Sequence, residues 1–478
     1  MKKKNILLIR TTNAEGTIPP LGLLYIASAI RNKNEFKEYN LKIIDFNYEK
    51  LDDNGFTKKI LDFLPDLILL SSLDSEYALF KKLCTLARQT APKSLLIAGG
   101  ILASNYHNEI ISNKLVDYVV RGEGELTIVE LLDAINNNKK LPLVKGITYR
   151  ENEKVIATPQ REFIQDLDAI PFPAWDLIDL KGYSKIPNWN GILFGKYYAP
   201  IMTSRGCVFN CIYCHNLFGK KIRTRSVENV LSEMKMLYKD YDIREFHIID
   251  DFFNFDLKRV INICKGIIKN KMKIKISFPN GLRADRMDKE TLIWLRKAGT
   301  YKINYAIETA SPRIQKLIKK NLNLEKATHY INETSKLGII TFGFFMFGFP
   351  TETVDEMEKT ISFAVHSKLD TAKFFKVIAF KNTQLENYTS KKLLSYQQSL
   401  QFVNTTAFYD ETINFSDIPT ETLNSIILNA HQQFYFRLGR VLRIIMKYRK
   451  FEAIKRLCAV YSYVLAKKRE NKEPQVIY

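Results

Sequence analysis

Two series of short apolar segments, each alternating with helical patterns, constrain the fold of this 478-residue chain more than any other feature. The first series lies within residues 1–140 and has five apolar runs, at 5–9, 41–45, 66–72, 94–100 and 117–125. Near-continuous apolar strands that alternate with helices indicate a parallel sheet covered on both faces. We therefore predict an α/β domain of flavodoxin-like or Rossmann-like type, with its ligand at the carboxyl ends of the strands.

The second series has six apolar runs, at 198–204, 245–250, 274–279, 302–308, 339–348 and 372–380. Six consecutive strand–helix units predict a partial (β/α)6 TIM-type barrel over residues 191–385, with its chemistry at the carboxyl ends of the strands. Residues 141–190 between the two series carry a hairpin pattern at 143–158, followed by a proline-bearing segment that is typical of a docked linker. Residues 386–478 show helical periodicity and predict a helical, basic C-terminal region.

The composition, with 46% hydrophobic and 26% charged residues, is that of a globular protein. No apolar run approaches the roughly 18–20 residues that cross a bilayer, and the apolar stretch after the N-terminal lysines is too short for a signal peptide. These features predict a cytoplasmic location. Six cysteines do not make a disulfide framework, and three of them (Cys84, Cys264 and Cys458) stand singly in helical patterns, which predicts inert buried thiols.

The other three cysteines, Cys207, Cys211 and Cys214, have the spacing C-x3-C-x2-C directly after the first strand of the second series. Thiolate ligands select iron–sulfur clusters or zinc. Structural zinc sites usually close with four ligands, often in two separated pairs, and this chain has no second CxxC. Three cysteines on one loop instead suit three irons of a cubane and leave the fourth iron open. Zinc and unliganded cysteines are the alternatives.

This spacing, with Ser-Arg-Gly before it, resembles the radical S-adenosylmethionine (SAM) superfamily. The resemblance implies a 4Fe–4S cluster on Cys207, Cys211 and Cys214, whose open iron binds the amino and carboxylate groups of SAM. It also implies that one electron cleaves SAM to a 5′-deoxyadenosyl radical. The same family pattern implies SAM-binding residues after the later strands, namely Asp250, Asp251, Asn280, Arg283, Glu308, Gly348 and Pro350. Helix capping by Asp251, Asn254 or Thr351 is the alternative interpretation of these polar positions.

The N-terminal series, followed by such a barrel, resembles the cobalamin-binding subfamily that includes anaerobic magnesium-protoporphyrin cyclase-like proteins. The segments that carry this resemblance are IPPLGLLYIAS (18–28), PDLILLSS (65–72), AGG (98–100) and VVRGEGELT (119–127). The resemblance implies a cobalamin site that includes Gly99, Gly100, Gly122 and Gly124, although these glycines could also serve only to close tight turns.

Two segments depart from the subfamily pattern. The loop TTNAEGTIPPLG lacks the histidine of an Asp-x-His-x-x-Gly motif, so we predict cobalamin without a protein histidine on cobalt. His107 is predicted to be a surface residue and no ligand. The segment FKNTQLEN keeps only Thr383 of a Pro-Gly-Thr turn, which indicates a diverged substrate-facing end.

The leading hypothesis is a cobalamin-dependent radical SAM enzyme that transfers a methyl group to an unactivated carbon. The alternative within the same chemistry is a cyclisation, rearrangement or oxidation with a vestigial cobalamin domain. Either reaction implies a small-molecule or lipid-like substrate and an electron donor such as flavodoxin or ferredoxin.

The net charge is +21, and residues 430–478 hold 12 Lys or Arg against 3 Glu. Within this region, residues 434–457 have the pattern of a basic amphipathic helix, which either packs on the barrel or makes peripheral contact with an anionic membrane. A third hypothesis, from a different class, is therefore a cluster-containing binding protein with a basic tail for membrane or nucleic acid. No RNA-binding motif accompanies the charge, so nucleic acid is the weakest of these partners.

Overall fold

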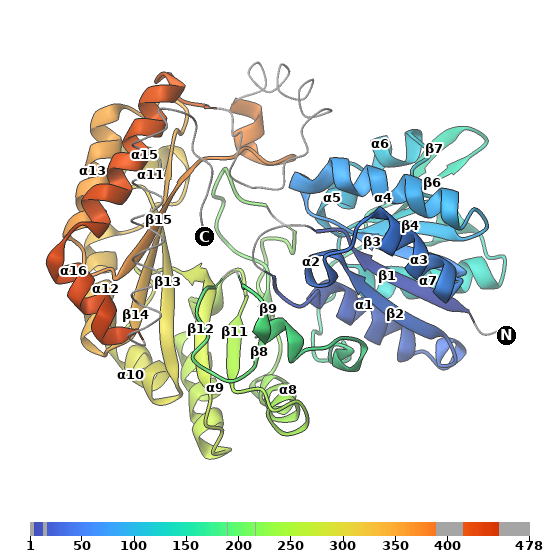
Figure 1. Ribbon diagram of the computed structural model, residues 1–478, viewed down its shortest axis with the longest axis horizontal. Helices are drawn as coiled ribbons and strands as arrows, with labels where there is room; N and C mark the ends of the chain where they lie inside the picture. Colours follow the sequence, from blue (N-terminus) through green and yellow to red (C-terminus); the bar gives the residue numbers. More distant parts are fainter. Residues whose placement is uncertain (1–3, 13–16, 189, 216, 389–413, 449–478) are drawn as a thin grey trace.

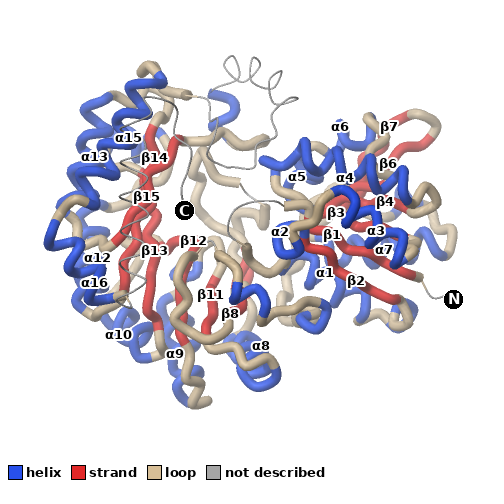
Figure 2. The backbone as a smooth tube through the Cα atoms, viewed as in Figure 1, coloured by secondary structure: helices blue, strands red, loops and turns tan. Residues whose placement is uncertain are grey.

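The computed structural model describes residues 4–12, 17–188, 190–215, 217–388 and 414–448. Two sheets, each flanked by helices, lie side by side, as Figure 1 shows. The first sheet is built from residues 5–157 and the second from residues 198–376. The tube view in Figure 2 shows that loops and turns occupy much of the space between them.

The first sheet has seven strands in the order β2-β1-β3-β4-β5-β6-β7. Strands β1 to β5 run parallel, whereas β6 and β7 form the predicted hairpin and extend this sheet by antiparallel pairing. The order of the five parallel strands is the doubly wound, flavodoxin-like order that the sequence predicts. The strands are β1 (Asn5–Arg10), β2 (Asn40–Asp45), β3 (Leu67–Ser71), β4 (Leu95–Gly99), β5 (Tyr118–Val120), β6 (Ile147–Glu151) and β7 (Lys154–Ala157).

Helices cover both faces of this sheet because successive side chains of its strands point to opposite sides. Ile6 and Leu8 of β1 share one core with two helices, α1 (Leu21–Arg31) and α7 (Gly124–Asn136). Leu7 and Ile9 face the other core, to which four helices contribute buried residues: α3 (Asp53–Phe63), α4 (Tyr77–Thr90), α5 (Gly100–Asn105) and α6 (His107–Ser112). The short helix α2 (Phe46–Glu49) follows β2.

The second sheet has six parallel strands in the order β15-β14-β13-β12-β11-β8. Within the described part of the chain, edge strands β8 and β15 do not pair with each other, so the barrel is open, as predicted. Its strands are β8 (Tyr198–Ile201), β11 (Glu245–Ile248), β12 (Lys275–Leu282), β13 (Thr300–Glu308), β14 (Ile340–Phe347) and β15 (Thr371–Lys376). The helices that alternate with them are α8 (Val227–Asp240), α9 (Leu257–Lys269), α10 (Lys289–Lys297), α11 (Pro312–Leu317), α12 (Leu324–Lys336) and α13 (Val354–His366).

The proline-bearing linker docks between the two sheets. The backbone N–H of Ala174 donates to the carbonyl of Leu24 in α1 at 3.2 Å. Trp175, which is 1% exposed, donates from its indole nitrogen to Glu233 of α8 at 3.3 Å. One continuous hydrophobic core therefore runs from the α1 face of the first sheet, through the linker, into the barrel. An extensive apolar contact of this kind holds two domains in one relative position.

The described part of the basic C-terminal region packs on the barrel as α15 (Thr420–Tyr435) and α16 (Leu438–Lys447). Arg440 is 2% exposed and donates to the carbonyls of Ala364 and Val365 at the end of α13. Lys447 forms an ion pair with the buried Asp370 at 2.8 Å. The rest of the predicted basic helix, from residue 449 on, lies outside the described residues. No helix among the described residues is long and apolar enough to cross a membrane.

Candidate active site

A short antiparallel pair, β9 (Ser204–Arg205) with β10 (Arg223–Thr224), closes residues 206–222 into a loop directly after β8. Gly206 begins this loop with φ +95°, and a Cβ there would lie 2.4 Å from the carbonyl oxygen of Lys221. Only glycine fits a position with this backbone conformation and this close approach. The local sequence therefore folds the three cysteines into a loop at the barrel mouth.

The backbone of the loop holds the three cysteines near one another. The N–H of Cys207 donates to the carbonyl of Gly219 at 3.2 Å, and that of Cys214 to the carbonyl of Cys211 at 3.2 Å. Cys214 interacts electrostatically with both Cys207 and Cys211. Burial raises the pKa of Cys207, and its neighbours Asp251 and Cys211 raise it further. A cationic iron cluster would offset this cost of ionising the thiols.

The donor set fits a cubane better than a single metal ion. Cys207 and Cys211 are half-buried and Cys214 is exposed, so all three can be reached from the barrel mouth. No group of three His, Cys, Asp or Glu side chains in the described chain converges on a single-ion site. In a 4Fe–4S cluster each thiolate instead binds a different iron, which matches three neighbouring cysteines on one loop.

Asp250 and Asp251, at the end of β11, differ in their surroundings. Asp250 is 3% exposed and accepts hydrogen bonds from the backbone N–H and hydroxyl of Thr203 and from the hydroxyl of Ser204. Asp251 is exposed and accepts the N–H of Gly206 at 3.2 Å. Asp250 therefore ties β11 to the start of the cysteine loop, and Asp251 is the carboxylate that faces the mouth. The capping alternative is wrong here, because Asp256 caps the following helix.

Asn280 lies near the carboxyl end of β12 and Arg283 directly follows this strand. Asn280 is exposed and donates to the carbonyl of Ile249 at 2.6 Å. Arg283 is 8% exposed, forms two hydrogen bonds with Asp285 and donates to the carbonyl of Lys320 at 2.8 Å. Its guanidinium also stacks on Phe209 of the cysteine loop at 4.0 Å. In the structure Arg283 therefore supports the cysteine loop, and its contact with SAM stays a prediction.

Glu308 ends β13 in the left-handed backbone region (φ +68°) and is 7% exposed. Its carboxylate pairs with Lys320 at 2.9 Å, and the Lys320 ammonium also lies 3.3 Å from the hydroxyl of Tyr213 in the cysteine loop. Lys320 lies in the connection between α11 and α12, and no spacing in the sequence singles it out. This buried cation beside the cysteine loop was not recognisable from the sequence, because only the fold brings it there.

Gly348 and Pro350 belong to the turn after β14. Gly348 has φ +88°, and a Cβ there would lie 3.0 Å from Leu423 of α15. The carboxylate of Glu352, 2% exposed, accepts the N–H groups of Gly348 and Phe349. Burial raises the pKa of Glu352 to about 8 even though these two donors oppose the shift. The capping alternative for Thr351 is wrong, because Thr353 caps α13 in a capping box with Glu356.

Of the four glycines predicted for cobalamin, Gly99 ends β4, and Gly100, Gly122 and Gly124 follow β4 or β5 at the carboxyl edge of the first sheet. Gly100 has φ +83° and lies against Ser71, whereas Gly122 has φ +73° and lies against Gln160. Gly124 lets α7 approach Ile26, since a Cβ there would lie 2.8 Å from that side chain. At Gly99, in contrast, a Cβ would meet only the carbonyl of Val120 at 3.9 Å. Local packing therefore explains three of the glycines, whereas at Gly99 it does not require a glycine, and the role of Gly99 in binding cobalamin stays a prediction.

His107 is half-buried, which corrects the prediction of a surface residue. Its Nδ1 lies 3.1 Å from the hydroxyl of Thr148, because the hairpin joins the first sheet next to α6. The sequence does not show this packing, since the hairpin was expected to belong to the connection between the domains. The cysteines predicted to be inert are buried where they are described: Cys84 is 0% and Cys264 is 2% exposed.

The carboxyl edge of the first sheet faces the cysteine loop. Asn105, which ends α5 after β4, accepts a hydrogen bond from Asn382 after β15 at 3.0 Å. Asp74, after β3, lies 3.8 Å from the imidazole of His215, next to Cys214. Burial raises the pKa of Asp74 to about 6. A ligand at the first edge and a ligand on the cysteine loop would therefore lie across from each other.

Comparison with known proteins identifies both halves of this arrangement. The family model described as the radical SAM superfamily matches residues 201–364, and the model of the B12 binding domain matches residues 7–132. A Pyrococcus horikoshii protein named as an uncharacterized methyltransferase is 31% identical over 93% of this chain and 94% of its own length. An anaerobic magnesium-protoporphyrin IX monomethyl ester cyclase of Synechocystis is 29% identical over 63% of this chain and 59% of its own length.

A solved structure has the same fold. The cobalamin-dependent SAM radical enzyme OxsB, determined with aqua-cobalamin and SAM bound, superposes with a TM-score of 0.69 and covers 98% of this chain and 72% of its own. Its sequence identity is 20%. Together with the cysteine loop and the facing edge of the first sheet, these matches define the family: the chain is an enzyme of the radical SAM superfamily, with a 4Fe–4S cluster, SAM and cobalamin as its cofactors, and it belongs to the subfamily with an N-terminal B12-binding domain.

Proposed function

We propose that this enzyme transfers a methyl group from SAM, by way of cobalamin, to an unactivated carbon of a small-molecule or lipid-like substrate. The observation that carries the proposal is the position of the B12-type edge, which contacts the cysteine loop through Asp74 and His215. When bound, the cluster supplies an electron that cleaves SAM to a 5′-deoxyadenosyl radical, and cobalamin supplies the methyl group.

The protein's own residues have distinct parts in this proposal. Cys207, Cys211 and Cys214 hold the cluster, and Asp251 offers a carboxylate at the mouth for the ammonium group of SAM. Gly99, where local packing would tolerate a side chain, would lie against cobalamin at the carboxyl edge of the first sheet.

The test uses the full chain, purified and reconstituted without oxygen. Two products of SAM separate the two halves of the reaction: 5′-deoxyadenosine reports the radical step, and S-adenosylhomocysteine reports donation of the methyl group. We expect about four irons per chain and both products when reduced cobalamin and a reductant are present. Cys211→Ala should lose iron and 5′-deoxyadenosine, whereas Cys264→Ala, which removes a thiol from α9, should keep both. A Cys211→Ala protein with full iron and full 5′-deoxyadenosine would refute the proposed cluster site.

A second candidate reaction is a cyclisation without methyl transfer, which the similarity to the Synechocystis cyclase favours. The same assay separates the two candidates. Release of 5′-deoxyadenosine with no S-adenosylhomocysteine at any cobalamin concentration would support the cyclisation and exclude the methyl transfer. The electron donor in both cases would be a flavodoxin or a ferredoxin.

The surface of α16 supports peripheral contact with the cytoplasmic face of an anionic membrane. Leu438, Leu442 and Met446 repeat every four residues and are 75%, 50% and 75% exposed. The exposed Arg437 lies beside this apolar stripe. We expect Leu442→Glu to lower flotation of the protein with phosphatidylglycerol vesicles, because it places a like charge against the membrane. Leu143→Glu, at a 77% exposed position of the N-terminal half, is the matched control, and equal flotation of both variants would refute this contact.

A further inference from the structure

Four buried charged residues connect the first sheet to the cysteine loop. Glu123 and Glu125 lie at the start of α7, directly after the carboxyl end of β5. Arg205 and Arg223 face each other across the β9–β10 pair that closes the cysteine loop. All four residues are 4–7% exposed. We call Glu123, Glu125, Arg205 and Arg223 the Glu–Arg quartet.

The quartet is closed by hydrogen bonds between its members. Arg205 reaches Glu123 at 2.9 Å with one guanidinium nitrogen and Glu125 at 2.5 Å with the other. Arg223 contacts both carboxylate oxygens of Glu123 at 2.9 Å. Two positive and two negative charges cancel, so the group is neutral as a whole. Each carboxylate comes from the B12-type half and each guanidinium from the strand pair β9–β10 that closes the cysteine loop.

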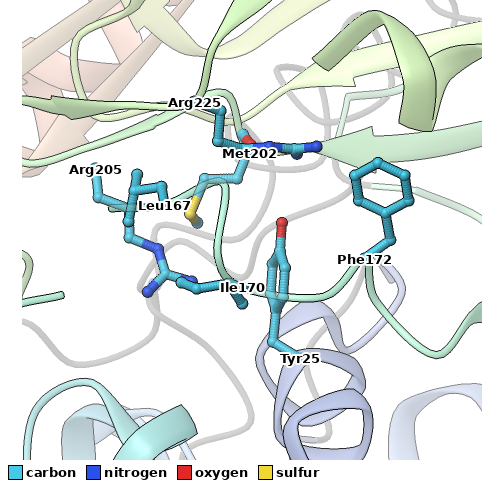
Figure 3. A pocket seen from close by; sticks show the side chains of 7 residues that line it. All are labelled: Tyr25, Leu167, Ile170, Phe172, Met202, Arg205 and Arg225. Atoms are coloured by element: carbon cyan, nitrogen blue, oxygen red, sulfur yellow. The ribbon is translucent and has the colours of Figure 1, made fainter. Parts of the chain in front are cut away.

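The linker and α1 complete the surroundings of the quartet. The N–H of Ile164 donates to Glu123 at 2.7 Å, and Arg223 donates to the carbonyl of Ile164 at 2.6 Å. The guanidinium of Arg205 lies 5.4 Å from the ring of Tyr25 in α1. Figure 3 shows Arg205 and Tyr25 lining one small pocket with apolar side chains of the linker. Three separate parts of the chain thus meet around these charges.

The energetic cost of burying charges indicates that the Glu–Arg quartet fixes the relative position of α7 and the cysteine loop. Replacing a buried ion pair by apolar residues of similar volume is often neutral or stabilising, so stability alone does not explain four buried charges. Removing one partner, in contrast, leaves an uncompensated buried charge and is strongly destabilising. The quartet is therefore satisfied in one relative position of α7 and the cysteine loop, and a shift of either element breaks several hydrogen bonds together.

The location of the quartet adds a functional consequence. Arg205 lies two residues before Cys207, and Glu123 directly follows Gly122 at the edge where the B12-type ligand is expected. We propose that the Glu–Arg quartet is a positioning device that sets the distance between cobalamin and the cluster-bound SAM. This inference rests on the proposed methyl transfer, because only that reaction requires the two cofactors to meet.

The test compares two carboxylates of the same helix. Glu125→Gln removes one charge of the quartet, and Glu130→Gln removes a carboxylate that pairs with Arg161 and is 49% exposed. We expect Glu125→Gln to lower the ratio of S-adenosylhomocysteine to 5′-deoxyadenosine at least tenfold, because methyl donation spans both halves and the radical step does not. Glu130→Gln should keep the wild-type ratio. A purely structural role would reduce both products together and leave the ratio unchanged.

A second measurement needs no cofactor. Amide hydrogen exchange of residues 206–222 in the apo protein should be at least tenfold faster in Glu125→Gln than in wild type or Glu130→Gln. The double variant Glu125→Gln/Arg205→Gln removes one charge of each sign. Exchange of the same amides should be slower in it than in Glu125→Gln or Arg205→Gln alone. If Glu125→Gln alone does not fold, the exchange rates of the double variant are compared with those of the wild type instead.

The outcomes separate the two proposals. If the wild-type enzyme releases no S-adenosylhomocysteine, the proposed methyl transfer fails, and the exchange measurement still decides whether the quartet holds the cysteine loop. Equal product ratios and equal exchange rates in Glu125→Gln and Glu130→Gln would overturn the inference.

Discussion

Lys320 allows a strong test of how the structure supports the cysteine loop. Its ammonium is the cation 2.9 Å from the carboxylate of Glu308, and both side chains are less than 10% exposed. It also reaches the hydroxyl of Tyr213, which stands between two of the cysteines. Lys320→Met keeps most of the side-chain volume and removes only the charge and its hydrogen bonds. The variant therefore leaves Glu308 buried without its cation.

The expected cost follows from the burial of the pair. Removing one partner of a buried ion pair destabilises a protein by about 3–5 kcal/mol. This is a large fraction of the total stability of about 5–15 kcal/mol that native proteins have. The double variant Lys320→Met/Glu308→Gln leaves no buried carboxylate without its cation. Its loss of stability should therefore be smaller than the sum of the losses of the two single variants. We expect a coupling of about 1–3 kcal/mol between the two positions.

Urea unfolding of the apo protein, followed by circular dichroism, measures these differences. Lys319→Met is the matched control, because Lys319 is the neighbouring residue and is exposed, with a hydrogen bond to Gln384. We expect this control to change stability by no more than about 0.5 kcal/mol. The reasoning would be refuted if Lys320→Met were no less stable than Lys319→Met, or if the double variant showed simple additivity.

Three further predictions concern the loop, a buried acid and a helix end. Gly206→Ala should lower the iron content after reconstitution, since its Cβ would lie 2.4 Å from the carbonyl of Lys221, and unchanged iron would contradict this. Glu352→Gln should flatten the pH dependence of stability. Burial raises the pKa of Glu352 to about 8, so the free energy of unfolding of the wild type should fall by about 3–5 kcal/mol as pH rises from about 4.5 to 8, and that of the variant should not. Parallel pH profiles of the urea midpoint in the two proteins would contradict a raised pKa at Glu352. Arg440→Met should lower the free energy of unfolding in urea by about 3 kcal/mol or more, because it removes the donors of the carbonyls at the end of α13. A decrease below about 1 kcal/mol would contradict this role of Arg440.

The sequence predicted the architecture well because the barrel strands and the first five strands of the N-terminal sheet are parallel. Strands of parallel sheets are buried on both faces, so each appears as an apolar run without alternation. The run at 5–9 covers all of β1 except Arg10, and the run at 245–250 contains β11. The hairpin was also recognisable from its charged centre. The strand that the hairpin pairs with was not recognisable, since nothing in the local sequence indicates that β6 pairs with β5 at the edge of the first sheet.

The capping residues show the limit of local patterns. Several polar residues near a helix start can cap it, and the sequence left capping by Asp251, Asn254 or Thr351 as the alternative to SAM binding. The structure uses Asp256 and Thr353, because the chain enters α9 and α13 a few residues later than the strand ends suggest. The entry point depends on how each helix packs against the barrel, and the sequence pattern does not contain that information.

The sequence by itself determined which side chains can hold a metal centre: three cysteines within eight residues, on a loop after the first of six strands, favour a cluster with an open iron over zinc. It determined this because the spacing along one loop is a local property. Only the tertiary structure decided which charges surround that loop. Lys320 meets Tyr213 across 107 residues, and Arg223 meets Glu123 across 100 residues. The Arg223–Glu123 contact depends on how the two sheets pack into one core, whereas the Lys320–Tyr213 contact depends on how the barrel itself folds. At either place, burial makes an uncompensated charge costly.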